Sequence, residues 1–271
     1  MLTLDIAIST YKPEGIKRVE NMLLSPQPGV RYIISWQEHK NTAIPDNLHK
    51  RDDVEIYRLD VKGLSNNRNN AIEHCSADII LIADDDLQYE TDAFIKIIKT
   101  FESLPQLDLA LFKADYSRKK NYPEHSCRIK LPFPKNYYVS SIEIAFRRSS
   151  LKDLRFWSQL GLGNDLLGCG EDEFFVISAV NRKLDCRFIN ETICSHPGET
   201  TGGKLEDSVL RGAGFITRVI YPKGYILRLP LKAYRSAKST NGNYFRILRE
   251  LFRGAQYSKS KFREIPENCK W

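Results

Sequence analysis

Three consecutive aspartates, Asp84, Asp85 and Asp86, directly follow the short apolar run at residues 79–83. The run is rich in β-branched residues and does not alternate with polar ones, which is typical of a strand buried on both faces of a parallel sheet. The carboxylates therefore follow the carboxyl end of that strand, where open α/β sheets bind ligands. Asp84 and Asp86 form a D-x-D pair, whose hard oxygen atoms suit Mg²⁺ or Mn²⁺, and such an ion can hold the phosphates of a nucleotide. Solvated turns also contain such pairs, so other groups must support this interpretation.

A second acidic pair, Glu171 and Asp172, lies in the segment GCGEDEFF, where a glycine-rich turn leads into an expected helix. Acids at a helix N-terminus complement the helix dipole, which is worth about 0.3–1 kcal/mol, and this purely structural role explains them without any chemistry. The functional interpretation is a general base, because the dipole keeps the carboxylate ionised while Gly168 and Gly170 let a substrate approach closely.

Arg68 and His196 are two further candidates. Arg68 lies with Asn69 in the first turns of an expected helix within GLSNNRNNAI, and it is either a surface residue or a guanidinium that binds a diphosphate at the helix start. His196 follows an expected strand and precedes a loop rich in glycine and threonine. It is either structural or a neutral nitrogen ligand that completes a metal site.

Strands that alternate with helices over the first half of the chain position these residues and predict a doubly wound α/β sheet. The residues between 115 and 137 are polar and contain three prolines, so we expect a loop over the sheet edge. The expected helices begin after Pro13 and at Ser65, Thr91 is the expected N-cap of the next helix, and further helices lie within 168–183 and 243–255. The expected strands cover residues 2–10, 30–36, 53–59, 79–83, 107–114, 137–146 and 185–190.

The composition, with 42% hydrophobic residues, supports a sizeable core. The start of the chain lacks the order of a signal peptide, and the chain lacks the 18 or so uninterrupted apolar residues of a spanning helix. We therefore expect a cytoplasmic protein that is soluble or peripheral to a membrane. Six scattered cysteines form no C-x-x-C pair, so we interpret them as ordinary thiols.

The positive charge is concentrated at the C-terminal end. Residues 211–271 contain fourteen basic and three acidic side chains, whereas the net charge of the whole chain is +7. Within this extension, residues 243–255 have Tyr244, Ile247, Leu248, Leu251 and Phe252 on one helix face and arginines elsewhere. Such a basic amphipathic helix fits an anionic membrane surface. Packing on the catalytic domain or in a homodimer explains it as well, and nucleic acid binding is the least favoured alternative.

Together these motifs resemble glycosyltransferase family 2 with the GT-A fold. The resemblance covers residues 3 to about 200 and rests on the order of ISTYKP, GLSNNRNNAI, ILIADDDL, IAFRRSSL, GCGEDEFF and His196. It implies a mostly parallel doubly wound sheet with a small antiparallel part, in a catalytic domain over residues 1–210 that is followed by the basic helical extension at 211–271. It also implies an inverting enzyme that transfers a sugar from a nucleotide-diphosphate donor to an acceptor hydroxyl with the help of Mn²⁺ or Mg²⁺.

The resemblance also implies a role for each candidate residue. Asp86, Asp84 and His196 are the expected metal contacts. Asp172 is the expected general base, with Glu171 in an accessory role beside it. The residues expected to contact the nucleotide sugar are Thr10, Tyr11, Arg68, Asp84 and Asp85.

The sequence departs from the family pattern at positions that bear on the nucleotide base and on the type of transferase. The second strand ends at Gln37 and Glu38 rather than at a base-reading aspartate, which leaves the nucleotide base open. No Q-x-x-R-W follows the base motif, which argues against a processive synthase, and we expect a role in assembling a surface polysaccharide or a lipid-linked glycan. A sugar nucleotidyltransferase is an alternative, but residues 9–18 lack its glycine-rich phosphate loop. A catalytically silent carbohydrate- or membrane-binding module of the same fold is the other alternative.

Overall fold

The computed structural model describes residues 1–117, 120–134, 137–196, 206–261, 265 and 267. The chain forms two compact units. The first comprises Met1–Lys62, Asn66–Leu154 and Ala179–Glu199, and the second comprises Gly63–Ser65, Arg155–Ser178 and Thr200–Trp271. The expected division into a catalytic domain and an extension at residue 210 stays a prediction.

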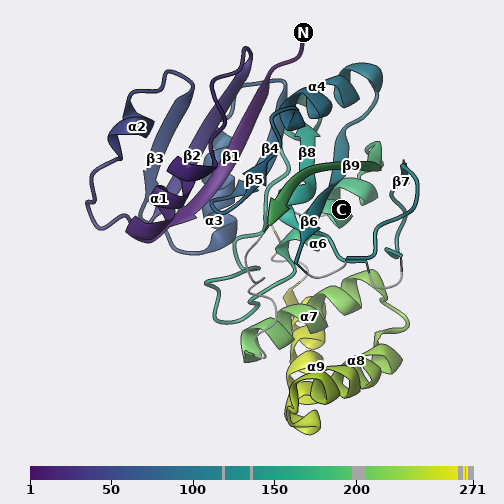
Figure 1. The fold of residues 1–271 in the computed structure, drawn as a ribbon. Coiled ribbons are helices and arrows are strands. Elements are labelled where there is room, and N and C mark those ends of the chain that lie inside the picture. Colours follow the sequence, from purple (N-terminus) through teal and green to yellow (C-terminus); the bar gives the residue numbers. More distant parts are fainter. Residues whose placement is uncertain (118–119, 135–136, 197–205, 262–264, 266, 268–271) are drawn as a thin grey trace. The chain divides into compact units, whose positions relative to one another are not determined.

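A single mixed sheet forms the centre of the first unit (Figure 1). Its strand order is β3-β2-β1-β4-β8-β6-β9-β5, and β7 pairs with β9 beside this path. Strands β3, β2, β1 and β4 are parallel, β8 is antiparallel to both of its neighbours, and β6 and β9 are parallel to each other. This arrangement confirms the predicted α/β fold with a mostly parallel sheet and a small antiparallel part. The bounds are β1 Leu4–Tyr11, β2 Val30–Gln37, β3 Val54–Leu59, β4 Ile79–Asp84, β5 Gln88–Tyr89, β6 Leu109–Tyr116, β7 Cys127–Arg128, β8 Ile144–Arg147 and β9 Cys186–His196.

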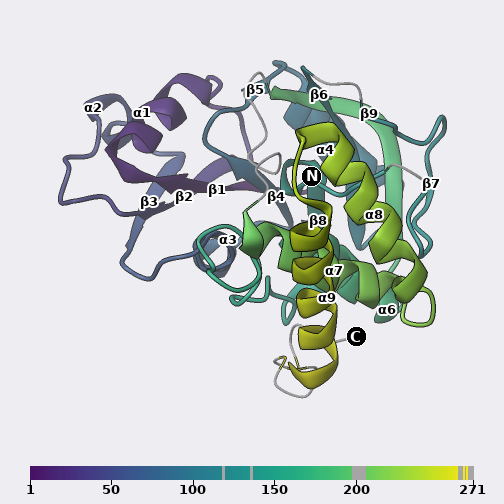
Figure 2. The same cartoon turned by 90° about the horizontal axis from the view of Figure 1, so that it is seen from below.

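Helices cover both faces of this sheet (Figure 2). On one face, α1 (Lys12–Met22), α2 (Asp46–His49) and α4 (Ala93–Ser103) bury their apolar residues in one cluster with alternate residues of β1, β2 and β4. On the opposite face lies α3 (Leu64–His74). The short helix α5 (Arg148–Leu151) follows β8. Because the parallel strands are covered on both sides, they are apolar without alternation, as their sequences indicate.

The structure corrects three details of the predicted elements. The strand expected over 137–146 is confined to β8, and the 3₁₀ turn η1 (Ser141–Glu143) precedes it. Asp92 rather than Thr91 occupies the N-cap position of α4, and no side chain caps that helix. The expected strand at 185–190 continues to residue 196, since β9 pairs with β6 along its length.

The second unit is helical. Helix α6 (Glu171–Asn181) begins in it, and α7 (Asp207–Ile220), α8 (Tyr225–Thr240) and α9 (Tyr244–Lys261) follow. Helices α7 and α9 approach so closely that a Cβ on Gly214 would lie 1.9 Å from the carbonyl oxygen of Leu251. The apolar face expected on the C-terminal helix is therefore used internally, and Ile247 and Leu251 are fully buried in one cluster with residues of α7 and α8. None of the helices in the described part of the chain has the length and apolar composition that crossing a bilayer requires.

Candidate active site

The three aspartates at the end of β4 have different surroundings. Asp85 is buried and fully bonded, because the Thr10 hydroxyl donates to it over 2.6 Å and the Arg18 guanidinium donates to both of its oxygens over 2.9 and 3.0 Å. Burial raises the pKa of Asp85, and the contacts with Thr10 and Arg18 counteract this rise. Thr10 and Asp85 therefore join the ends of β1 and β4, and their expected contacts with a nucleotide stay predictions.

Asp84 is oriented by Arg68. The Arg68 Nη2 lies 3.3 Å from Oδ1 of Asp84 and donates to the Ser141 hydroxyl over 2.6 Å. The Arg68 side chain is 3% exposed, whereas that of Asp84 is 34% exposed. The structure thus brings Arg68 and Asp84 together, and it identifies Ser141 as a partner that the sequence analysis missed.

Asp86 lies beside His196, as the metal-site hypothesis requires of both residues. The Nε2 atom of His196 is 3.4 Å from Oδ1 of Asp86, and this contact holds the pKa of Asp86 below its ordinary value. Apart from this 3.4 Å contact with His196, the buried Oδ1 atom of Asp86 accepts no hydrogen bond from the described part of the chain. A buried carboxylate oxygen with so few donors marks a place where a ligand would bind favourably.

Polar residues of α3 tie the strand ends together. Asn67 donates to the carbonyl oxygen of Thr10 over 2.9 Å, and Asn70 donates to the hydroxyl of Ser35 over 2.8 Å. With Arg68, these side chains connect the helix to the ends of β1, β2 and β4. The sequence analysis singled out only Arg68 and Asn69 in this segment. The asparagine-rich run SNNRNN was the available signal, because so many amides in a helix indicate hydrogen bonds outside it.

The neighbouring ends of β1 and β2 carry exposed and strained residues. Tyr11 is 44% exposed, and its hydrogen bond to Glu38 lowers the pKa of that carboxyl. Lys12 and Glu38 have φ angles of 64° and 47°, a left-handed conformation that costs roughly 1–2 kcal/mol for a residue with a side chain. Backbone strain of this kind is found at binding sites, and Tyr11 stays a predicted nucleotide contact.

A second polar cluster surrounds Glu143, which is completely buried. Its Oε1 accepts hydrogen bonds from Lys120 Nζ over 2.5 Å, Tyr122 over 2.6 Å and Tyr116 over 3.1 Å. The Lys120 ammonium also lies 4.1–5.4 Å from four tyrosine rings, those of Tyr116, Tyr122, Tyr137 and Tyr138. Because η1 carries both Ser141 and Glu143, this cluster anchors the turn that contacts Arg68.

Glu171 and Asp172 belong to the second unit. They lie in the first turn of α6 together with Glu173, and Glu171 is buried. The preceding Gly170 has a φ angle of 98°, and a Cβ there would lie 2.3 Å from Ile216. Only glycine therefore fits this turn without a rearrangement. The expected roles of Glu171 and Asp172 in catalysis stay predictions.

Comparison with known proteins gives a family match over the middle of the chain. Residues 38–155, which include Arg68 and the three aspartates, match the model of glycosyl transferase family 2. This match spans 118 of the 271 residues and supports a family 2 glycosyltransferase. Comparison with curated protein sequences gave no match.

Solved structures agree with this family in fold. The S. aureus TarS 1–349 structure in complex with UDP-GlcNAc has a TM-score of 0.59 and 13% sequence identity, over 97% of this chain and 92% of that chain. The TarS 1–349 complex with UDP has a TM-score of 0.58 and 13% identity over the same shares. A further TarS 1–349 structure has a TM-score of 0.57 and 13% identity, over 96% of this chain and 73% of that chain. At this identity the likeness concerns the fold.

The side chains that could ligate a metal in this glycosyltransferase suit a divalent ion that is bound together with a substrate. Within the described residues, no three Asp, Glu, His or Cys side chains form a cluster that alone could hold a metal. Mg²⁺ rarely needs such a cage, because proteins usually bind it through one or two carboxylates plus substrate phosphates and water. The carboxylate of Asp84, whose side chain is 34% exposed, and the Oδ1 atom of Asp86 meet this requirement.

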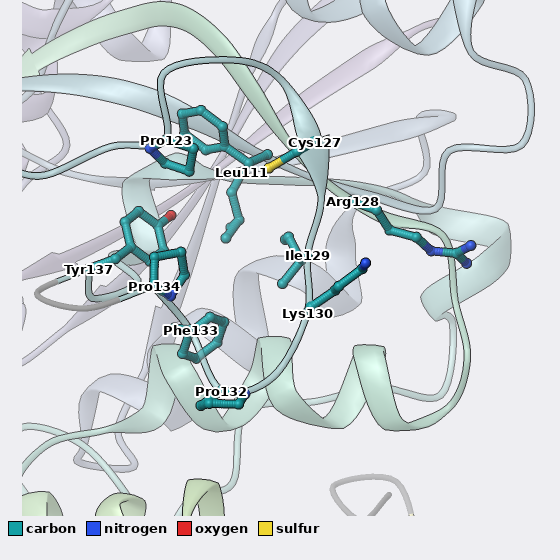
Figure 3. Close-up of a pocket in the computed structure, with 11 residues that line it drawn as sticks. Leu111, Pro123, Cys127, Arg128, Ile129, Lys130, Pro132, Phe133, Pro134 and Tyr137 are labelled. Atoms are coloured by element: carbon teal, nitrogen blue, oxygen red, sulfur yellow. The ribbon is translucent and has the colours of Figure 1, made fainter.

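An apolar pocket of about 180 Å³ also occurs in the first unit of the glycosyltransferase (Figure 3). Phe133, Pro134 and Tyr137 lie along one side of it and Ile129 along another, while the guanidinium of Arg128 points away. None of the predicted site residues lines this pocket. The pocket therefore shares no lining residue with the candidate active site. Tyr137, which lines the pocket, also contacts the Lys120 ammonium of the cluster around Glu143.

Proposed function

We propose that this glycosyltransferase moves a sugar from a nucleotide-diphosphate donor to an acceptor hydroxyl, with inversion and with the help of Mn²⁺ or Mg²⁺. The observation that supports the proposal is the pair Asp84 and Asp86 at the end of β4. Arg68 contacts Asp84, and His196 contacts Asp86. All but His196 lie within the segment that matches the family. Because the TarS structure of similar fold holds UDP-GlcNAc, a uridine-diphosphate sugar is the first donor to test.

In this proposal Asp86 and Asp84, with His196 beside them, hold the divalent ion. When bound, the ion neutralises the charge that develops on the departing diphosphate. The lowered pKa of Asp86 keeps this carboxylate ionised at neutral pH. Arg68 holds Asp84 in place and supplies a fixed positive charge next to it, which preorganises this end of the sheet for an anion. Thr10, Tyr11 and Asp85 complete the proposed nucleotide side.

Asp172 is the proposed general base. Inversion by a single displacement requires the acceptor oxygen to attack the sugar carbon from the face opposite the diphosphate. The new bond from the acceptor oxygen to that carbon forms as the bond from the carbon to the phosphate oxygen breaks. The acceptor proton moves to a carboxylate oxygen of Asp172, and Glu171 acts in an accessory role beside it. Separate acids are needed because one carboxylate cannot serve the leaving group and the attacking group at once.

The acceptor that we propose is a glycan or a lipid-linked glycan of surface polysaccharide assembly, reached at the inner face of the cytoplasmic membrane. The basic charge of residues 211–271 supports a location near anionic lipid. The alternative to membrane binding is that the helices within residues 211–271 form the contact of a homodimer.

Turnover with a panel of nucleotide sugars and Mn²⁺ tests the proposal. We expect slow release of nucleoside diphosphate, a product anomer opposite to that of the donor by NMR, and loss of activity on chelation. Asp172→Asn should abolish transfer and leave the donor dissociation constant nearly unchanged, whereas the control Glu173→Gln in the same helical turn should keep transfer. Exchange of pyrophosphate into the donor would indicate a nucleotidyltransferase instead. Donor binding without any turnover would indicate a silent binding module.

A further inference from the structure

Helix α8 has a second apolar stripe, opposite to the one that it buries. Leu229 and Ala233 are fully buried among the helices of the second unit. On the other side, Leu227, Leu231 and Tyr234 are 83%, 49% and 59% exposed. Their spacing of four and three residues places them in one line along the helix. Exposed apolar residues are common singly, but a continuous stripe of large ones indicates a surface that contacts something.

Cations without acidic partners border this stripe. Residues 208–249 contain nine Lys and Arg and no Asp or Glu. The exposed members on or next to α8 are Lys223, Arg228, Lys232, Arg235 and Lys238. In the described part of the chain, none of these five forms an ion pair, and Arg228 stacks on the ring of Tyr221 at 3.7 Å.

The arginines of the neighbouring helices are bound differently. Arg211, Arg249 and Arg253 all form ion pairs with the buried carboxylate of Glu250, and Arg246 forms an ion pair with Asp207. These four arginines of α7 and α9 thus each have an acidic partner inside the unit, and two carboxylates serve all four. Among the described residues, no acid compensates the positive charge of α8, so this charge is available to an external anion.

We propose that the exposed face of α8 docks the protein on a lipid bilayer that contains anionic lipid. Leu227, Leu231 and Tyr234 would enter the boundary between headgroups and acyl chains, where an amphipathic helix buries its apolar side. The adjacent Arg and Lys side chains reach the headgroup phosphates, and their long aliphatic stems follow the apolar surface. An anionic bilayer fits this face better than other partners do, because the face combines apolar side chains with charge of one sign.

The same charges disfavour a second copy of this chain as the occupant. A twofold contact places a face against itself, so every cation of α8 would meet cations of its copy without an acid to separate them. Nucleic acid would compensate the charge but leave the central leucine stripe without an apolar partner. The proposal deepens the proposed function, because it names the surface by which the enzyme reaches a lipid-linked acceptor. It rests on the surface of α8 alone, so vesicle binding and sugar transfer can fail separately.

Flotation of the full chain with vesicles tests the proposal. We expect binding to vesicles of phosphatidylcholine and phosphatidylglycerol in equal parts, little binding to phosphatidylcholine alone, and weaker binding as salt is raised. Leu231→Glu combined with Arg235→Glu should weaken binding on the order of 100-fold, since it adds two anions and removes a cation and an apolar contact. The matched control is Ile95→Glu with Lys99→Glu, at the same spacing on the exposed face of α4, and it should bind as the wild type does.

Three results would overturn the proposal. The first is equal vesicle binding by the α8 variant and the wild type at the same unfolding midpoint. The second is a wild-type dimer in sedimentation that the α8 variant converts to monomer while vesicles bind neither, which assigns the face to a second copy. The third is binding to a duplex DNA of random sequence that exceeds binding to anionic vesicles at the same salt concentration. Vesicle binding with an inactive enzyme would leave the docking surface intact and contradict only the proposed function.

Discussion

Two regions of the first unit contain buried carboxylate oxygens that differ in the number of hydrogen bonds they accept. At η1, the carboxylate of Glu143 accepts hydrogen bonds from Lys120, Tyr116 and Tyr122 and is completely buried. At the end of β4, the buried Oδ1 of Asp86 accepts no hydrogen bond from any described residue apart from its 3.4 Å contact with His196, while the side chain as a whole is 38% exposed. Burial alone therefore does not separate a structural carboxylate from a functional one.

The number of donors around each oxygen makes the distinction. A saturated buried carboxylate has no capacity left for a ligand, and its removal leaves its partners uncompensated. An unsaturated one keeps the capacity to accept an interaction from a ligand. Asp85 lies between the two cases, since Thr10 and Arg18 occupy its oxygens but Arg18 is about half exposed. The comparison therefore predicts a loss of stability for Glu143, a loss of activity for Asp86 and a mixed result for Asp85.

Replacing Glu143 should have the largest effect. Glu143→Gln removes the carboxylate that is paired with the buried Lys120 ammonium, which should lower the free energy of unfolding by about 3–5 kcal/mol. Urea denaturation followed by circular dichroism measures the loss. The double variant Glu143→Gln with Lys120→Met should recover much of it, because both charges are then gone. A loss below about 1 kcal/mol, or double-variant losses that simply add, would show that the cluster is not a coupled buried pair.

Replacing Asp86 should affect activity and spare the fold. Asp86→Asn should lower the transfer rate about 10²–10³-fold, since charge stabilisation at the leaving group is weakened. It should also raise the Mn²⁺ concentration needed for half-maximal rate, which separates a metal ligand from a merely structural residue. Asp52→Asn, on an exposed loop, is the control and should change neither quantity. Full activity of Asp86→Asn at low Mn²⁺ would remove Asp86 from the proposed metal site.

The strand ends could be predicted from sequence because a parallel sheet gathers the carboxyl ends of its strands at one edge. This reasoning correctly found β1, β2, β3, β4 and β6, and it placed Asp84 and Asp86 at the end of β4. It could not find Ser141 or Arg18, because the contact of each with this edge depends on tertiary packing between segments far apart in sequence. The Lys120–Glu143 pair was missed for the same reason, since single charged residues in a polar loop look solvated.

The helical unit shows a different limit. Periodicity identified the apolar face of α9, but it could not tell whether that face is buried by protein or available to a membrane. The structure shows that Ile247 and Leu251 are buried by neighbouring helices. The exposed stripe lies on α8, where two apolar lines on opposite sides, together with Pro230 inside the helix, obscure a simple amphipathic pattern. Amphipathic periodicity thus indicates that a face has a partner, and the packing of the other helices decides which partner.

Replacing Asp85 should give a smaller effect on stability than replacing Glu143. Asp85→Asn removes the negative charge and one of the two acceptor oxygens that Thr10 and Arg18 use. The half-exposed guanidinium can return to water, so we expect a loss of about 1–2 kcal/mol in the free energy of unfolding. The donor KM tests the predicted nucleotide contact independently. A raised KM with unchanged kcat would support a direct contact, whereas unchanged kinetics would assign Asp85 to the join between β1 and β4 alone.

The smallest effect concerns the pH dependence of stability, for which the neighbours Asp85 and Asp86 should have opposite signs. Burial raises the pKa of Asp85 above its ordinary value of 3.8, whereas His196 lowers that of Asp86. Asp85 therefore contributes most below pH 3.8 and loses this contribution as the pH rises through its raised pKa. Asp86 contributes above pH 3.8 and loses its contribution as the pH falls through its lowered pKa.

Urea unfolding of the wild type, Asp85→Asn and Asp86→Asn between about pH 3 and 6 measures this difference. As the pH rises through this window, the stability gap between the wild type and Asp85→Asn should narrow, and the gap to Asp86→Asn should widen. Slopes of the same sign for the two variants would mean that His196 does not favour the ionised form of Asp86, and the electrostatic difference between the two neighbouring carboxylates would be lost.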